Sequence, residues 1–219
     1  MRATTKHQGL SYILVPMRQD GIEIRPIVQV TGTSEFNEVF FDGARAAADD
    51  VVGGVNQGWK VAMGTLAFER GASTLGQQLG FENELATVIE LARKRGLADD
   101  PLVRQRLADA WVGLRVMRYN ALRSLTTFER GEITPLTSIH KLYWAGFHQR
   151  LGELAMHVLG ADGQIADREI ADGTTYELSA MQRLFLWSRA DTIYGGADQI
   201  QRNVIGEQAL GLPKEPRPA

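Results

Sequence analysis

The sequence contains no cysteine among its 219 residues. This absence excludes a disulfide framework, a thiolate metal site and a cysteine nucleophile. It is typical of a protein in a reducing compartment, so we expect a cytoplasmic location. The formal net charge is only -2. Both signs are interspersed along the chain, so neither a nucleic-acid-binding surface nor an acidic tail is predicted.

Long apolar runs are also missing. No run approaches the roughly 20 residues that a membrane-spanning helix needs, so we expect no membrane span. The apolar stretch LSYILVPM (10–17) is short and is followed by no small-residue cleavage site, which argues against a signal peptide. With 44% hydrophobic residues, the chain can form one large core or two modest domains.

The first fifty or so residues have the composition of strands. LSYILVPM (10–17), IEIRPIVQV (22–30) and EFNEVFFDG (35–43) are rich in β-branched and aromatic residues, and DDVVGGVNQG (49–58) is typical of a loop. Three strands alone would leave unpaired edges, which are an aggregation hazard. We therefore expect either that helices cover these strands or that another piece of chain completes the sheet.

From Gln57 onward the apolar residues recur at helical spacing. This pattern predicts helices over 57–95, 101–130, 135–159, 174–193 and 197–210, with Pro101 as a first helical residue and Gly211 as a stop signal. The predicted fold is mainly α, an up-and-down C-terminal bundle of about five helices preceded by an incomplete antiparallel β segment. We expect the domains to span residues 1–55 and 56–219.

Glu69 and the glycine pair Gly195–Gly196 are the candidate functional positions in the sequence. Glu69 has no basic residue three or four positions away, and it lies on a helical stripe that is apolar before it and small after it. The helical pattern alone favours a solvated glutamate, since glutamates are seldom buried, and the alternative is a general base in an apolar pocket. Similarly, Gly195 and Gly196 in TIYGGADQIQRN (192–203) indicate either an ordinary loop-to-helix junction or a cradle of backbone N–H groups for a polar ligand.

The histidines do not predict a metal site. None of the four forms a pair at the i, i+3 or i, i+4 spacing of a helical metal site, so each is interpreted as a structural or surface residue: His7, His140, His148 and His157.

Four stretches occur in an order that resembles the C-terminal half of an acyl-CoA dehydrogenase. They are GLSYILVPM (9–17), TSEFNEVFFDGARAAADDVVGGVNQGWKVAM (33–63), LAFERG (66–71) and IYGGADQIQRNVIGEQALGLP (193–213). The resemblance implies the end of a middle β domain plus a C-terminal helical domain. It also implies FAD-dependent α,β-dehydrogenation of an acyl-CoA thioester, in which a carboxylate removes the α-proton and the β-hydrogen leaves as hydride to the flavin.

The resemblance implies roles for individual residues. Many family members place the catalytic base directly after the tyrosine of the final motif, where this chain has Gly195. Another branch carries the base in a Glu-Arg pair on the first long helix, which corresponds here to Glu69 and Arg70. Glu69 is therefore the expected base, and the expected substrate-binding residues are Arg70, Tyr194 and Gly195. The expected FAD-binding residues are Gly196, Gln199, Arg93, His157 and Ala161.

The sequence also departs from the family pattern. Ala197 replaces a usual threonine, His157 replaces a typical glutamine, and ARKRGLADD (92–100) stands where an arginine-aromatic-glycine motif is expected. These departures weaken the expectation that this chain supplies the FAD contacts across a subunit interface. The family's N-terminal helical domain and the first half of its β domain are not matched, so we expect that this chain alone neither holds FAD nor turns over substrate.

Two functions follow from the resemblance. The first is a catalytic dehydrogenase half within a longer or heteromeric enzyme, and the second is a non-catalytic structural subunit or inactive fragment that completes a partner's flavin site. The expected partners are an acyl-CoA substrate, an electron-transfer flavoprotein as acceptor and further subunits of a tetramer-like homo- or hetero-oligomer. The implied metabolic setting is fatty acid metabolism and lipid degradation.

Overall fold

The structure is a computed structural model that describes residues 7–72, 74–130, 136–166, 168–169 and 176–214. Within these ranges it does not describe the side chains of residues 67–72, 74–75, 128, 136–138 and 168–169. The chain divides into two compact units, Met1–Gln29 with Thr33–Ala72, and Val30–Gly32 with Ser73–Ala219. The proposed domain division after residue 55 stays a prediction.

The described residues of the first unit form four short strands, the 3-10 helix η1 (Ala48–Asp50) and one α-helix. β1 (Tyr12–Ile13) pairs antiparallel with β4 (Val51–Val52), and β2 (Ile22–Ile27) pairs antiparallel with β3 (Phe36–Phe41). The helix α1 spans Gly58–Ala72. The predicted strands are confirmed but shorter. The expectation of a loop over 49–58 was wrong at β4, where two β-branched valines pair with β1.

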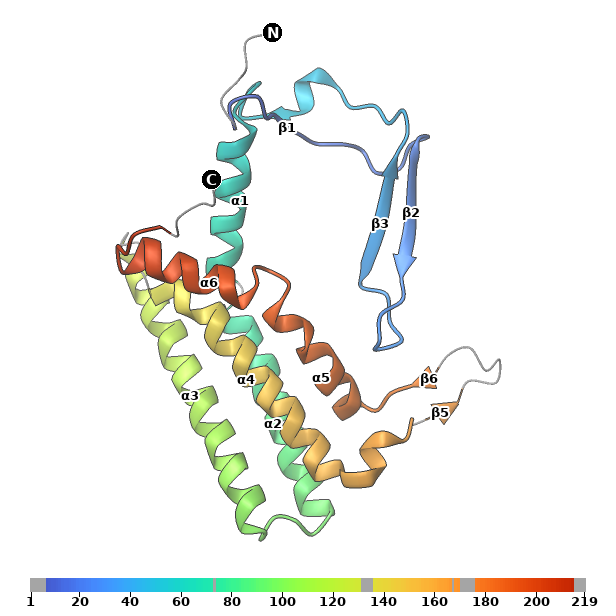
Figure 1. Cartoon of the computed structure of the whole chain (residues 1–219), viewed down its shortest axis with the longest axis vertical. Helices are drawn as coiled ribbons and strands as arrows, with labels where there is room; N and C mark the ends of the chain where they lie inside the picture. Colours follow the sequence, from blue (N-terminus) through green and yellow to red (C-terminus); the bar gives the residue numbers. More distant parts are fainter. Residues whose placement is uncertain (1–6, 73, 131–135, 167, 170–175, 215–219) are drawn as a thin grey trace. The chain divides into compact units, whose positions relative to one another are not determined.

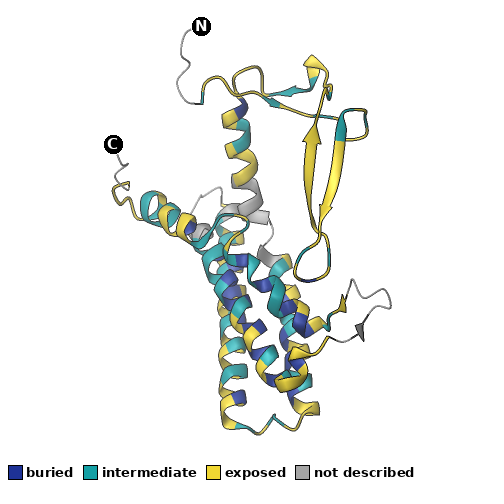
Figure 2. Cartoon of the chain, turned by 45° about the vertical axis from the view of Figure 1, so that its right-hand side comes forward, coloured by how far each residue is buried: buried dark blue, intermediate teal, exposed yellow. Residues whose placement is uncertain are grey.

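The β2–β3 hairpin is apolar and exposed. Every residue of β3 is exposed, and Figure 2 shows the hairpin almost entirely in the colour of exposed residues. Six large apolar side chains of the hairpin are each between 38% and 58% exposed: Ile24, Ile27, Phe36, Val39, Phe40 and Phe41. Isolated two-stranded hairpins are marginally stable in water. The hairpin therefore presents apolar side chains that the rest of the first unit does not cover.

The second unit is a helical bundle, as the sequence predicts. Its long helices are α2 (Thr74–Lys94), α3 (Pro101–Glu129) and α4 (Leu136–Leu159), which lie side by side in Figure 1. Shorter elements follow: η2 (Gly160–Gln164), β5 (Arg168–Glu169), β6 (Tyr176–Glu177), α5 (Ala180–Ser188), η3 (Ala190–Thr192), α6 (Asp198–Val204) and the π-helical η4 (Ile205–Ala209).

Apolar side chains from the three long helices and α5 form one core. Its most deeply buried large members include Val88, Val103, Met117, Leu151 and Val158. The helix α4 contacts α2, α3, α5 and α6, so it is the central helix of the bundle. No helix in the described part of the chain is both long and apolar enough to cross a membrane.

Helix ends follow their local sequence. The helix α3 begins at Pro101, and the Asp100 side chain accepts hydrogen bonds from the backbone N–H groups of Leu102 and Val103, both at 2.9 Å. The prediction of one helix over 57–95 falls on two elements, α1 and α2, and residue 73 between them lies outside the described residues.

The prediction of a helix over 174–193 was wrong at its beginning. Tyr176 and Glu177 form β6, and α5 begins only at Ala180. Ser179 fixes this start by a reciprocal pair of bonds with Gln182, since each side chain accepts a hydrogen bond from the other residue's backbone N–H. The predicted last helix, 197–210, is confirmed as α6 and η4.

Candidate functional site

The glycine turn before α6 requires its glycines. Gly195 and Gly196 have φ angles of 63° and 98°, in the left-handed region that favours glycine. Gln201, only 1% exposed, donates from Nε2 to the carbonyl oxygens of Gly195 (3.2 Å) and Gly196 (3.4 Å). A Cβ atom at position 196 would lie 2.4 Å from that same Nε2. The buried amide therefore closes the turn on one side and leaves no room for a side chain at 196.

The start of α6 is formed by Ala197 and Asp198. Ala197 is the N-cap residue and makes no side-chain capping bond. One carboxylate oxygen of Asp198, Oδ1, is buried without a hydrogen-bond partner among the described residues. Buried polar atoms are normally satisfied. Because this oxygen is closed off from solvent, it belongs to the packing at the start of α6 and is not an accessible contact for a ligand.

Tyr194, directly before the turn, is held as a neutral phenol. Its Oη donates to Asp191 Oδ1 at 2.9 Å, and its ring lies near those of Trp144 and Trp187, with centroids 6.3 and 6.2 Å away. Burial, reinforced by the negative charge of Asp191, raises the pKa of Tyr194 well above its ordinary value. Tyr194 can therefore donate a hydrogen bond but does not ionise near neutral pH.

A buried charged cluster lies beneath Tyr194. His148 contacts Asp191 Oδ2 through Nδ1 and Glu84 Oε2 through Nε2, the latter at 3.0 Å. Burial lowers the pKa of His148, but hydrogen bonds to the two carboxylates outweigh it and raise the pKa to about 9. The imidazole is therefore charged at neutral pH.

Lys141 completes this cluster. Its Nζ donates to the backbone carbonyl oxygen of Asp191 and lies 5.1 Å from the centroid of the Tyr194 ring. Burial lowers the pKa of Lys141, while the charges of Asp191 and Asp198 oppose that change.

Glu69 and Arg70 lie on the backbone of α1, but their side chains lie outside the described residues. Their assignment as base and substrate contact stays a prediction. At the turn, Tyr194 is partly buried, and Gly195 and Gln199 are exposed.

The remaining predicted residues lie at a different end of the bundle. Arg93 lies in the last turn of α2 and pairs with Glu90 at 3.7 Å, whereas His157, in the last turn of α4, and Ala161, in η2, are exposed. From Lys141, beside Tyr194, to His157 the α4 axis rises about 24 Å. The structure therefore separates the predicted residues of this unit into two groups instead of one site.

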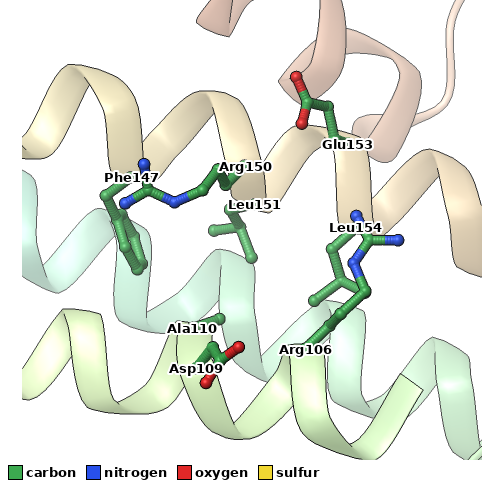
Figure 3. A pocket seen from close by; sticks show the side chains of 8 residues that line it. All are labelled: Arg106, Asp109, Ala110, Phe147, Arg150, Leu151, Glu153 and Leu154. Atoms are coloured by element: carbon green, nitrogen blue, oxygen red, sulfur yellow. The ribbon is translucent and has the colours of Figure 1, made fainter. Parts of the chain in front are cut away.

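A pocket of about 220 Å³ lies between α3 and α4 (Figure 3). Two arginines and two acids line it together with apolar side chains: Arg106, Arg150, Asp109 and Glu153. Glu153 pairs with Arg189 at 3.0 Å. The charges are of both signs, so this pocket selects no ligand class by charge. Among the described residues, no group of three or more His, Asp or Glu side chains is arranged to hold a metal ion.

The sequence interpretation missed the residues that organise the turn, namely Gln201, Asp191, Lys141 and Glu84. His148 was interpreted only as a structural or surface histidine, and it is the buried centre of a charged cluster. One signal was available: Lys141, Trp144 and His148 have the i, i+3, i+7 spacing of one helix face.

Known proteins resemble this chain over nearly its whole length. The family model of the acyl-CoA dehydrogenase C-terminal domain matches residues 56–210. The acyl-CoA dehydrogenase IpdE1 of Mycobacterium tuberculosis is 54% identical over 98% of this chain, and FadE34 of the same organism is 34% identical over 95%. Among solved structures, the Tcur3481-Tcur3483 steroid ACAD matches 98% of the chain with a TM-score of 0.84 and 27% identity.

These matches cover only part of the relatives. The chain corresponds to 54% of IpdE1, 27% of FadE34 and 55% of the matched steroid ACAD chain, so it spans about half, or less, of each of them. The domain match covers most of this chain, and the strand-then-helix layout and the glycine turn agree with it. The chain therefore belongs to the acyl-CoA dehydrogenase family.

Proposed function

We propose that this chain is the catalytic half of an FAD-dependent acyl-CoA dehydrogenase that acts within a longer or heteromeric enzyme. The observation that carries the proposal is the 54% identity to IpdE1 over 98% of the chain. The reaction is α,β-dehydrogenation of an acyl-CoA thioester. The relatives named above include a steroid ACAD, which makes a bulky, ring-bearing acyl group a reasonable first substrate to assay.

The chemical step assigns Glu69 as the base. Its carboxylate takes the α-proton, and Arg70, the next residue, helps to position the thioester end of the substrate. Bound FAD supplies a two-electron acceptor for the β-hydrogen, which leaves as hydride. A carboxylate within reach of the α-carbon is the general base that this proton transfer requires.

The glycine turn fits the polar edge of a flavin. The glycines at 195 and 196 let a ligand approach the backbone of the turn closely. Gly196 and Gln199 would hold FAD here, while Tyr194 and Gly195 would face the substrate. Arg93, His157 and Ala161 form the other group, with His157 about 24 Å from Lys141 along α4, and would then serve the FAD of a neighbouring subunit.

Further chain is needed for a complete enzyme. The β2–β3 hairpin has six partly exposed large apolar side chains, and this chain covers only 54% of IpdE1 and 27% of FadE34. The name of the matched steroid ACAD combines two proteins, which supports a heteromeric assembly as one form of the complete enzyme. A tetramer-like oligomer and an electron-transfer flavoprotein as acceptor complete the proposal.

One observation favours a second function, a structural subunit that completes a partner's flavin site. Ala197 caps α6 without a side-chain hydrogen bond, so this turn lacks a hydroxyl that could contact a flavin. Under this alternative the chain shapes the site, and Glu69 takes no part in the chemistry.

Replacing the base separates the two functions. The chain is produced together with the missing dehydrogenase half, and acyl-CoA oxidation is measured for wild type, Glu69→Gln and a control, Glu129→Gln, on the exposed end of α3. A base predicts a loss on the order of 10²–10⁴-fold for Glu69→Gln at unchanged FAD content. An unchanged rate would establish the structural role, and the control is expected to match wild type.

A further inference from the structure

We infer that the cluster formed by the buried His148 and Asp191 with the partly exposed Glu84 is a positioning device that holds Tyr194 and thereby sets the glycine turn 194–196. Throughout, "positioning cluster" denotes these three residues. The inference rests on the proposed function only in that the turn is the part of this unit that meets flavin and substrate.

Asp191 is the link between the cluster and the turn. It is fully buried, and its two carboxylate oxygens are used separately, Oδ2 by His148 and Oδ1 by the phenol of Tyr194 at 2.9 Å. Its backbone carbonyl oxygen accepts from Lys141. Three polar contacts therefore fix one residue three positions before Tyr194.

The other end of the cluster is anchored in the bundle. His148 lies on α4. The centroid of its ring is 4.4 Å from that of Phe81 on α2, and its Nε2 bonds Glu84, which also lies on α2. Phe81 and His148 are both nearly inaccessible to solvent. Asp191 therefore cannot move without breaking its contact with His148, which is packed between the long helices α2 and α4. The cluster thus restrains Tyr194, which bonds Asp191.

The turn itself is held from two sides. A Cβ atom at Gly195 would lie 3.4 Å from Cε of Lys141, so the lysine stem runs alongside the turn. On the other side the buried Gln201 amide bonds the carbonyl oxygens of both glycines. The Gln201 contact is local to the turn, whereas Lys141 on α4 and Asp191 connect the turn to the core of the bundle.

The cluster works only with a charged imidazole. A neutral imidazole carries one N–H and cannot donate to Asp191 and Glu84 together, whereas the imidazolium donates to both. The charged groups around His148 are Glu84 from α2, Asp191 from η3, Arg183 of α5, which lines the same surface depression, and Lys141 on its own helix. Loss of the proton therefore breaks one of the two links, and the turn loosens.

His140 provides a matched control. It lies on the same helix, is 6% exposed against 4% for His148, and bonds only Ser124 Oγ, at 2.8 Å, among the described residues. His140→Gln removes a buried histidine without touching the turn. A general loss of packing would affect both variants alike.

The test measures hydrogen exchange of the backbone amides in residues 193–199 by mass spectrometry in the full chain, for wild type, His148→Gln and His140→Gln. We expect exchange about tenfold faster in this segment for His148→Gln and unchanged exchange for His140→Gln. Equal exchange of the turn in the two variants would overturn the inference.

If His148→Gln does not fold, Tyr194→Phe decides the matter. It leaves the positioning cluster intact and removes only the hydroxyl group by which Tyr194 bonds Asp191, so exchange should rise in 193–199 and stay constant in α2 and α4. Unchanged exchange in the turn refutes the inference.

An activity measurement distinguishes positioning from mere stability. In the enzyme reconstituted with the missing half, His148→Gln should raise KM for the acyl-CoA about tenfold, whereas His140→Gln should leave KM unchanged. A wild-type enzyme without dehydrogenase activity would refute the proposed function, while the exchange data would still decide the positioning role.

Discussion

Replacing Gly196 by alanine tests the geometry of the turn directly. The φ angle of 98° is strained for any residue with a Cβ, which costs about 1–3 kcal/mol. The new Cβ would lie 2.4 Å from Gln201 Nε2, so this amide must leave the two carbonyl oxygens that it bonds. An unsatisfied buried amide costs about a further 1–3 kcal/mol. We therefore expect Gly196→Ala to lower the free energy of unfolding by roughly 2–6 kcal/mol.

The neighbouring glycine supplies the control. At Gly195 the φ angle is 63°, and a Cβ would meet only Cε of Lys141, at 3.4 Å, an ordinary contact. Gly195→Ala should therefore cost only about 1 kcal/mol, the usual penalty for alanine in this backbone region. Urea unfolding followed by helical circular dichroism measures both variants. Equal unfolding midpoints for Gly195→Ala and Gly196→Ala would show that Gln201 does not close the turn as described.

Two further predictions concern pH and helix packing. Because the folded-state pKa of His148 is raised from 6.5 to about 9, its contribution, roughly 3 kcal/mol, is complete below pH 6.5 and is lost as pH rises through 9. The urea concentration at the unfolding midpoint should thus fall between pH 6 and pH 10 in wild type and change much less in His148→Gln. If the midpoints of the two proteins fell in parallel with pH, His148 would not be the charged group. Gly152→Ala should lower the melting temperature, since its Cβ would lie 2.9 Å from Cα of Phe185 and force α4 and α5 apart. Gly80→Ala, on α2 with no atom within 4 Å of the new Cβ, should raise it through about 0.5–1 kcal/mol of helix propensity; the opposite order would contradict the α4–α5 packing.

Local features of the sequence determined most of the elements. Asp100 and Pro101 begin α3 because a carboxylate caps the first N–H groups and proline needs no hydrogen bond there. The start of α5 is also determined by local sequence, because Ser179 and Gln182 form a capping box. The spacing of apolar residues before Ser179 nevertheless predicted a longer helix. The family was also recognisable, because its motifs occur in order along the chain and the domain match later covered residues 56–210.

The arrangement of the turn came only from the tertiary structure. Glu84 and Asp191 are 64 and 43 residues from His148 in sequence, and nothing in the spacing of these residues pairs them. Helix formation depends on contacts three and four residues apart, which a sequence displays. Buried ion pairs depend instead on which helix faces meet in the core. The packing of α2, α4 and η3 converts an unremarkable histidine into the charged centre of the positioning cluster.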